Sequence, residues 1–178
     1  ISGASSIHTI RWANALCDRG HEVHLITQHQ PIEAITPNIE VHQFPYCGPV
    51  GYFSMVPKVA WLLRKICPDI VNAHYASGYG TTARLVNYRP FLLSVWGSDV
   101  YDFPAKSFLH KNIVKSKLMS ADLVASTSYC MADKAHEVAP NLKDIEVTPF
   151  GVDLDQFSLS SGQMDNESPN IVIGTVKT

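Results

Sequence analysis

Several features that would place a chain in a specialised class are missing from this sequence. It has no Cys-x-x-Cys pair, and its four cysteines are scattered over 178 residues. This spacing favours neither a zinc ribbon nor a disulfide framework, and we expect reduced, mostly buried thiols in a cytoplasmic protein. The chain has a net charge of -2 and lacks the clustered basic surplus of a nucleic-acid binder, so no nucleic-acid partner is expected.

Long apolar runs and secretion signals are missing as well. The chain opens with ISGASS, without the basic and apolar regions of a signal peptide. It also lacks an initiator methionine, so we expect residues upstream of Ile1. Hydrophobic residues make up 46% of the chain and charged residues 17%. This is the composition of an ordinary globular domain with a core large enough to fold without crosslinks.

What the sequence does contain is an alternation of strand and helix patterns. Strands are predicted at 21–27, 39–44, 70–74, 91–96, 123–126 and 145–148, and helices at 5–19, 53–67, 79–88, 107–119 and 129–138. Helical crossovers of this length join parallel strands. The fold class predicted is therefore α/β, a Rossmann-like doubly wound parallel sheet. Its ligand crevice lies beyond the carboxyl ends of the strands, so the residues just after each strand are the functional candidates.

The last part of the sequence predicts a second domain. Residues 1–157 form the first domain, and residues 158–169 are polar and serine-rich, as interdomain linkers are. Residues 170–178 then begin a fresh strand. Because a lone strand cannot form a domain, we expect further chain after Thr178.

Small residues precede the first predicted helix. Gly3, Ser5 and Ser6 leave backbone N–H groups at the helix N-terminus free to face an anion such as a diphosphate. An ordinary capped turn would have the same sequence. The fuller Gly-x-Gly-x-x-Gly pattern is absent, which disfavours a nicotinamide dehydrogenase.

Histidines are the obvious candidates for chemistry. His74 ends a predicted strand with Tyr75 beside it, on the crevice side, although a hydrogen-bonded loop histidine would occupy the same position. His21 and His24 are three residues apart on a strand and point to opposite faces, so they cannot bind one metal together. No other cluster has metal-ligand spacing, and no metal site is predicted.

A turn with polar side chains follows the strand at 91–96. Gly97 permits a sharp bend, and Ser98 and Asp99 either orient a substrate hydroxyl or cap the next segment. Trp96 offers a broad apolar plate of the kind on which sugars stack, but a buried tryptophan would look identical in sequence.

The predicted helix at 53–67 is apolar on more than one face. Phe53, Met55, Trp61, Leu62 and Ile66 lie outside its main apolar stripe, and basic residues are interleaved with them. This pattern fits either a core helix or a surface that meets a membrane or a lipid-linked acceptor.

Four segments together resemble the retaining glycosyltransferases of family 4. They are IHTIRWANAL with GHEV within residues 7–23, PDIVNAH at 68–74, SVWGSDV at 94–100 and TPFGVDLDQF at 148–157. The last segment is the most specific, because it is similar to the family's exit from its N-terminal domain. The order and spacing of the segments cover nearly the whole chain.

The resemblance implies a GT-B enzyme with two Rossmann-like domains facing a cleft, of which this chain is the N-terminal, acceptor-side domain. Such an enzyme transfers a sugar from a nucleotide-sugar donor to a glycan or lipid-linked acceptor with retention of configuration, without a metal or other cofactor. The implied role is in surface polysaccharide or glycolipid biosynthesis. The implied location is the cytoplasm, with peripheral contact to the inner face of the membrane, and the fragment alone is expected to be inactive.

The resemblance also assigns residues. Gly3 and Ser5 match the loop that approaches the donor diphosphate, and His74 matches a strand-end position facing the cleft. Many members place a histidine in an H-G-x-D segment where this chain has Trp96, so only Gly97 and Asp99 fit that pattern. The catalytic candidates are therefore His74 and Asp99.

Two other functions remain open from the sequence. A sugar-nucleotide 2-epimerase shares the two-domain architecture but rearranges the donor, and a non-catalytic nucleotide- or glycan-binding module would need no catalytic residues. A pair of glutamates eight positions apart after Thr178 would favour the transferase.

Overall fold

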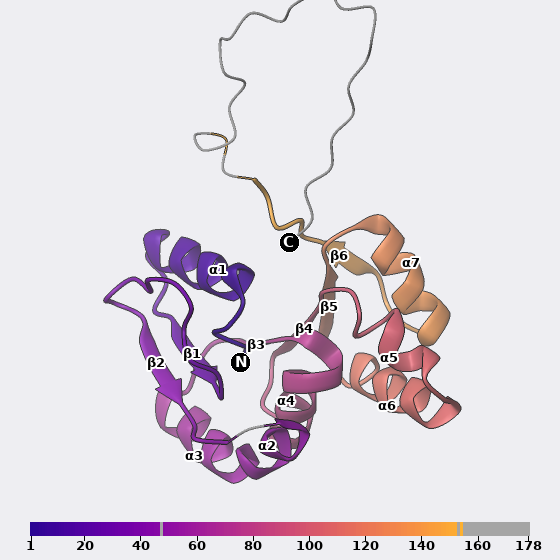
Figure 1. The fold of residues 1–178 in the computed structure, drawn as a ribbon, viewed down its shortest axis with the longest axis horizontal. Helices are drawn as coiled ribbons and strands as arrows, with labels where there is room; N and C mark the ends of the chain where they lie inside the picture. Colours follow the sequence, from indigo (N-terminus) through magenta and orange to yellow (C-terminus); the bar gives the residue numbers. More distant parts are fainter. Residues whose placement is uncertain (47, 153, 155–178) are drawn as a thin grey trace, which may run out of the picture.

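A parallel β-sheet with helices on both faces forms the fold, which confirms the predicted α/β class (Figure 1). The computed structural model describes residues 1–46, 48–152 and 154. The strands are β1 (His24–Thr27), β2 (Glu40–Gln43), β3 (Val71–His74), β4 (Phe91–Val95), β5 (Leu123–Ser126) and β6 (Ile145–Val147). The helices are α1 (Ile7–Asp18), α2 (Gly48–Ser54), α3 (Val56–Ile66), the π-helical turn η1 (Tyr75–Tyr79), α4 (Gly80–Val86), α5 (Asp102–Ala105), α6 (Phe108–Leu118) and α7 (Tyr129–Val138).

The first two residues of the chain connect two groups of strands. β1 pairs with β2, and β3, β4, β5 and β6 pair in that order, all in parallel. Ser2 N donates to the Ile26 carbonyl (2.9 Å), and His74 N donates to the Ile1 carbonyl (3.1 Å). The extended backbone of Ile1 and Ser2 therefore lies between β1 and β3 and makes the sheet continuous.

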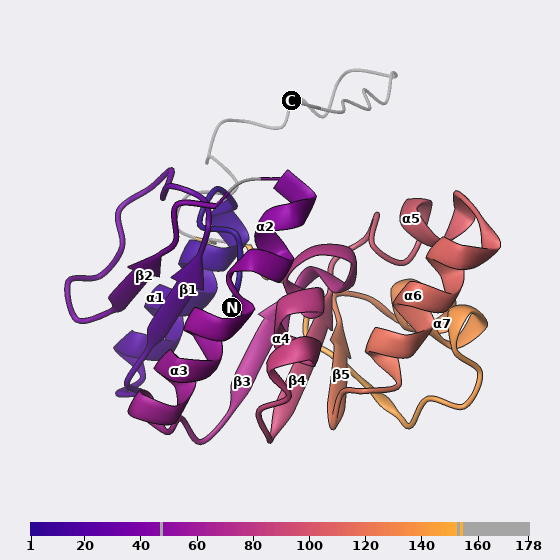
Figure 2. The ribbon, with the colours of Figure 1, turned by 90° about the horizontal axis from the view of Figure 1, so that it is seen from below.

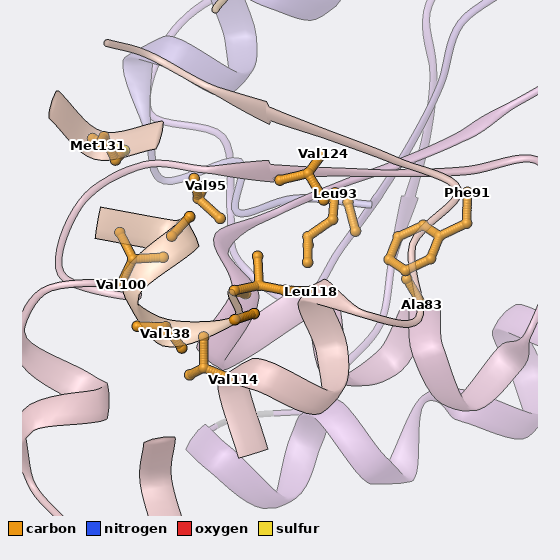
Figure 3. Close-up of a cluster of buried hydrophobic side chains, with 14 residues drawn as sticks. Ala83, Phe91, Leu93, Val95, Val100, Val114, Leu118, Val124, Met131 and Val138 are labelled. Atoms are coloured by element: carbon orange, nitrogen blue, oxygen red, sulfur yellow. The ribbon is translucent and has the colours of Figure 1, made fainter. Parts of the chain in front are cut away.

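Side-chain alternation along β1 explains why helices cover both faces. Leu25 packs with Ala13 of α1, whereas the next residue, Ile26, packs with Val59 of α3. Figures 1 and 2 show α1 on one side of β1 and α3 on the other. A larger core lies over β4, where Leu93 and Val95 meet aliphatic side chains of α6 and α7 (Figure 3).

The structure corrects several predicted boundaries. The helix predicted at 53–67 is two helices, α2 and α3, because Pro57 in the first turn of α3 has no N–H to donate to a preceding carbonyl. The strand predicted from residue 21 begins only at His24. Neither α5 nor η1 was predicted. The predicted linker at 158–169 and strand at 170–178 lie outside the described residues.

The cysteines also differ from expectation. Cys67 and Cys130 are exposed and Cys17 is half-buried, so the prediction of mostly buried thiols is wrong for these three, all of which are free. They occupy the last turn of α1, the C-cap of α3 and the first turn of α7. Cys67 and Cys130 face solvent there, whereas Cys17 packs against the core cluster that contains Ala13 and Leu25. In the part of the chain that the structure describes, no helix has the length and apolar character needed to cross a membrane.

Candidate functional site

The loops that follow the strands meet at the carboxyl-terminal end of the sheet, as parallel topology requires. This end, called the rim below, carries the loop before α1, the turn η1 directly after β3, and the loop at 96–99 directly after β4. β3 and β4 pair in register from Val71 with Phe91 to His74 with Ser94. Their two following loops therefore start side by side.

Asp99 fastens these two loops together. Its carboxylate is fully buried and accepts hydrogen bonds from the backbone N–H groups of Ala76 (2.8 Å), Gly97 (2.8 Å) and Trp96 (3.1 Å). Burial raises the pKa of Asp99, and these backbone hydrogen bonds oppose that rise. The carboxylate is thus occupied by main-chain donors from both loops.

The turn that Asp99 holds is conformationally strained. Tyr75 has φ of 74°, a region that costs a non-glycine residue about 1–3 kcal/mol. It opens the π-helical turn η1, a geometry that is frequent at functional sites. The Tyr75 hydroxyl hydrogen-bonds the hydroxyl of Ser98 across the rim. Gly97 has φ of 141°, so the loop at 96–99 needs glycine there.

His74 lies beneath the rim in a closed hydrogen-bond network. Ser94 Oγ donates to Asn72 Oδ1 (3.0 Å), which turns Asn72 Nδ2 toward His74 Nε2 (3.2 Å). His74 Nε2 is then the acceptor, and Nδ1–H donates to Ser2 Oγ (2.9 Å). Burial lowers the pKa of His74 to about 3. Both ring nitrogens are therefore committed, and the ring is neutral.

An aromatic cluster joins three distant segments at the rim. The half-buried Trp96 ring packs on His74 (4.4 Å between centroids) and meets Phe150 edge-on (5.3 Å). Phe150 in turn stacks on His8 of α1 (3.7 Å, 7° between planes). His8 and Phe150 were not candidates in the sequence analysis, although both lie in segments that carry the family resemblance.

The loop before α1 also lies at the rim. Ala4 N donates to Thr27 Oγ1 (3.1 Å), which ties this loop to the end of β1. Ser6 occupies the N-cap position of α1 but makes no side-chain capping bond, and Ser5 is exposed. The first N–H groups of this helix, which is 12 residues long, are therefore available for an anion. The backbone conformation at position 3 does not require a glycine, since the φ of Gly3 is not positive.

An open pocket of about 440 Å³ runs along α1 from the aromatic cluster. It carries two arginines, Arg11 and Arg19, both exposed. The full lining is His8, Arg11, Trp12, Ala15, Leu16, Arg19, Pro149 and Phe150. The pocket therefore offers cationic and aromatic groups next to the rim.

A buried lysine supports η1 from below. Lys117 of α6 is 4% exposed, and its Nζ donates to Thr81 Oγ1 (2.6 Å) and lies 3.5 Å from the Ser77 carbonyl. Burial lowers the pKa of Lys117 to about 8. No sequence signal identified this residue, because only the packing of α6 under η1 brings it there.

Among the residues that the structure describes, three with potential metal-ligand geometry lie away from the rim. His24, Glu40 and His42 place one ligand atom each within 4.8 Å of the others. The sequence analysis predicted no metal site because it compared residues along single strands, whereas this cluster forms across β1 and β2.

Comparisons with known proteins give a consistent result. The profile of a family described as "Glycosyl transferase 4-like" matches residues 1–128. The chain is 24% identical over 159 residues to "N-acetyl-alpha-D-glucosaminyl L-malate synthase" of Bacillus anthracis, which covers 81% of this chain and 41% of that protein. It is 30% identical over 97 residues to "Putative teichuronic acid biosynthesis glycosyltransferase TuaC" of Bacillus subtilis (strain 168), covering 53% of this chain and 24% of that protein. The chain thus spans less than half the length of these curated relatives.

Proposed function

The chain belongs to the glycosyl transferase 4-like family, and on that premise we propose that it is the acceptor-side domain of a retaining glycosyltransferase. The complete enzyme transfers a sugar from a nucleotide-sugar donor to a glycan or lipid-linked acceptor, in surface polysaccharide or glycolipid biosynthesis. The names of both relatives, one a glucosaminyl malate synthase and the other a teichuronic acid glycosyltransferase, support this class of reaction.

The observation that carries the proposal is the paired loop structure at the rim. One carboxylate, Asp99, fixes the backbone of both loops, and these loops carry the side chains of Tyr75, Trp96 and Ser98. An aromatic plate beside hydroxyl groups suits a sugar ring, which presents C–H groups on one face and hydroxyls at its edge. The N-terminus of α1, which also lies at the rim, suits the anionic donor diphosphate.

Positioning is the contribution that this domain makes to the reaction. In a retaining transfer, the bond from the anomeric carbon to the donor diphosphate breaks and the acceptor oxygen bonds to the same face of that carbon. The acceptor proton passes to the leaving phosphate oxygen. Such a reaction needs alignment and charge stabilisation more than a strong base, and the second domain supplies the main donor contacts.

His74 and Asp99 enter this function as positioning residues. We predicted from the sequence that they act directly in catalysis, and that role stays a prediction. Both side chains are buried, and their polar atoms bond to the protein itself. Their effect on transfer therefore passes through Trp96, which packs on His74, and through Tyr75, whose turn Asp99 holds.

Exposed apolar side chains on α2 and α3 support contact with a membrane. Val50 and Phe53 of α2 and Trp61 of α3 are 71%, 58% and 63% exposed, and Lys65 stacks over Trp61 (5.7 Å). Of the other apolar residues predicted outside the main stripe, Met55 and Leu62 are buried in the core. This surface therefore supports peripheral binding next to a lipid-linked acceptor.

The test of the proposed function uses the full-length protein and a panel of nucleotide sugars. We expect transfer with retained anomeric configuration, measured by NMR of the product. Trp96→Ala should lower kcat/KM for the acceptor at least tenfold, because it removes the sugar-facing plate. Phe108→Ala, a change at an aromatic residue of α6 that is 81% exposed, is the matched control and should leave kcat/KM unchanged.

Three results would contradict this proposal. They are an inverted product, epimerisation of the donor without transfer, or an active Trp96→Ala enzyme. The 178-residue chain alone should show no transfer, and measurable transfer by it would overturn the two-domain arrangement.

A further inference from the structure

The first two strands bring three potential metal ligands onto one face of the sheet. β1 and β2 pair in parallel, with His24 opposite Glu40 and Ile26 opposite His42. Paired residues in neighbouring strands point to the same face, as do residues two apart on one strand. His24, Glu40 and His42 therefore project together from β1 and β2, and β2 is the outer strand labelled in Figure 1.

The distances within this cluster match those between the ligands of one metal ion. His24 Nδ1 lies 3.0 Å from His42 Nε2 and 3.4 Å from Glu40 Oε2, and His42 Nε2 lies 3.7 Å from Glu40 Oε1. Ligand atoms about 2.0–2.1 Å from a tetrahedral zinc ion are about 3.3–3.4 Å apart. The distance between the two imidazole nitrogens, and the distance from each of them to one of the Glu40 oxygens, are thus within a few tenths of an ångström of that value.

A fourth residue fixes the tautomer that metal binding requires. Glu22 Oε1 lies 3.0 Å from His24 Nε2 and accepts a hydrogen bond from the N–H group at that nitrogen. The lone pair of His24 Nδ1 is then free to face His42 and Glu40. Carboxylates that orient a ligating histidine in this way are typical of zinc sites.

Burial and charge around the cluster also suit a cation. The His24 and His42 side chains are each 15% exposed, whereas Glu40 is 66% exposed. The two imidazoles are therefore held in place, and the carboxylate side stays open to ions and water. Lys65 is a nearby cation, whereas the carboxylates of Glu22 and Glu40 both contact His24, at 3.0 and 3.4 Å.

We propose that His24, Glu40 and His42 bind one divalent transition-metal ion of the zinc class, with water completing the coordination. Three protein ligands of the His, His, Glu type with an open position are a known zinc arrangement. His24 stands at the amino end of β1, whereas Thr27 at its carboxyl end contacts the rim. The ion therefore fastens the exposed edge strand β2 to β1 and takes no part in sugar transfer.

Calorimetric titration of chelator-treated protein with zinc chloride tests this site. We expect one ion per chain and a saturable rise in Tm. His42→Ala and Glu40→Gln should each weaken zinc binding at least tenfold, and Glu22→Gln should weaken it about 10–100-fold through the orientation of His24. His21→Ala, at an exposed histidine outside β1, is the matched control and should bind zinc as the unaltered protein does.

Two further measurements keep the test decisive. Glu40 is mostly exposed, so Glu40→Gln remains folded even if a histidine variant does not. Cobalt(II) replaces zinc and reports its ligands by absorption, and a spectrum without a thiolate charge-transfer band excludes the cysteines. Zinc binding that is absent, equal in all variants, or accompanied by that thiolate band would overturn the proposal.

Discussion

Replacement of Asp99 distinguishes a residue that positions the rim from one that reacts with the substrate. In Asp99→Ala, the buried N–H group of Ala76 and the partly buried N–H groups of Trp96 and Gly97 lose their shared acceptor. Each buried donor left without a partner costs about 1–3 kcal/mol. Allowing for partial relaxation, we expect the free energy of unfolding to fall by about 3–5 kcal/mol, a large part of the roughly 5–15 kcal/mol of a typical domain.

Asp99→Asn provides a graded version of the same change. The amide oxygen can still accept from Trp96 and Gly97, but the amide nitrogen then faces the Ala76 N–H, donor against donor. We expect about 1–3 kcal/mol of lost stability, from that one bond. Asp133→Ala, at an exposed aspartate of α7, is the control and should change the unfolding free energy by less than about 0.5 kcal/mol.

Denaturant unfolding, amide hydrogen exchange and turnover together decide the outcome. If Asp99 positions the rim, both variants lose stability in the order Ala, then Asn, and the Ala76 amide exchanges faster in both. Turnover of the full-length enzyme falls in the same order, because Tyr75 and Trp96 lose their support. If Asp99→Ala keeps its stability while turnover collapses, the carboxylate acts on the substrate itself and the positioning role is wrong.

Three other predictions concern two buried titratable groups and the proposed metal site. His74 has a pKa of about 3 in the folded state against 6.5 ordinarily, so only the unfolded chain takes up its proton between these values. Stability should fall as the pH drops below about 6.5, less steeply in His74→Gln, and equal slopes in acid denaturation would contradict this. Lys117, with a pKa lowered from 10.5 to about 8, should make stability rise from pH 8 to 10.5. A Lys117→Met protein that keeps this rise in urea titrations would refute that assignment. Chelation should lower the Tm but leave turnover of the full-length enzyme intact, and activity restored only by added metal would contradict a metal-independent transfer.

The sequence predicted the fold well where periodicity alone decides it. All the described strands were expected within a few residues, because buried parallel strands are short apolar runs between helical patterns. The break between α2 and α3 was missed although Pro57 signalled it, since the apolar pattern continues across the break. The turn η1 could not be predicted, because its π-helical geometry depends on Asp99, a residue 23 positions away from Ala76.

The places of His74 and Asp99 in the fold were predicted from the sequence, but their hydrogen-bond partners were not. Strand order alone indicated that His74 and Asp99 would lie near the carboxyl-terminal end of the sheet. Whether a side chain at a strand end projects into the crevice or turns inward depends on its partners. Those partners are Ser2 and Asn72 for His74 and main-chain amides for Asp99. Such partners are distant in sequence, so no local pattern distinguishes the two cases.

A common principle connects the inward-turning polar groups at the rim. A loop that must hold Tyr75 at φ of 74° keeps that conformation only if the surrounding structure fixes it more strongly than the strain opposes it. Asp99 above and Lys117 below both bond to this turn, at Ala76 N and, more weakly, at the Ser77 carbonyl. Buried charges are unfavourable unless hydrogen-bonded, so their presence here is explained by the turn they hold. The polar core beneath the rim therefore maintains the backbone shape of η1 and of the loop at 96–99. In the proposed function, it is the half-buried Tyr75 and Trp96 and the exposed Ser98 that contact the substrate.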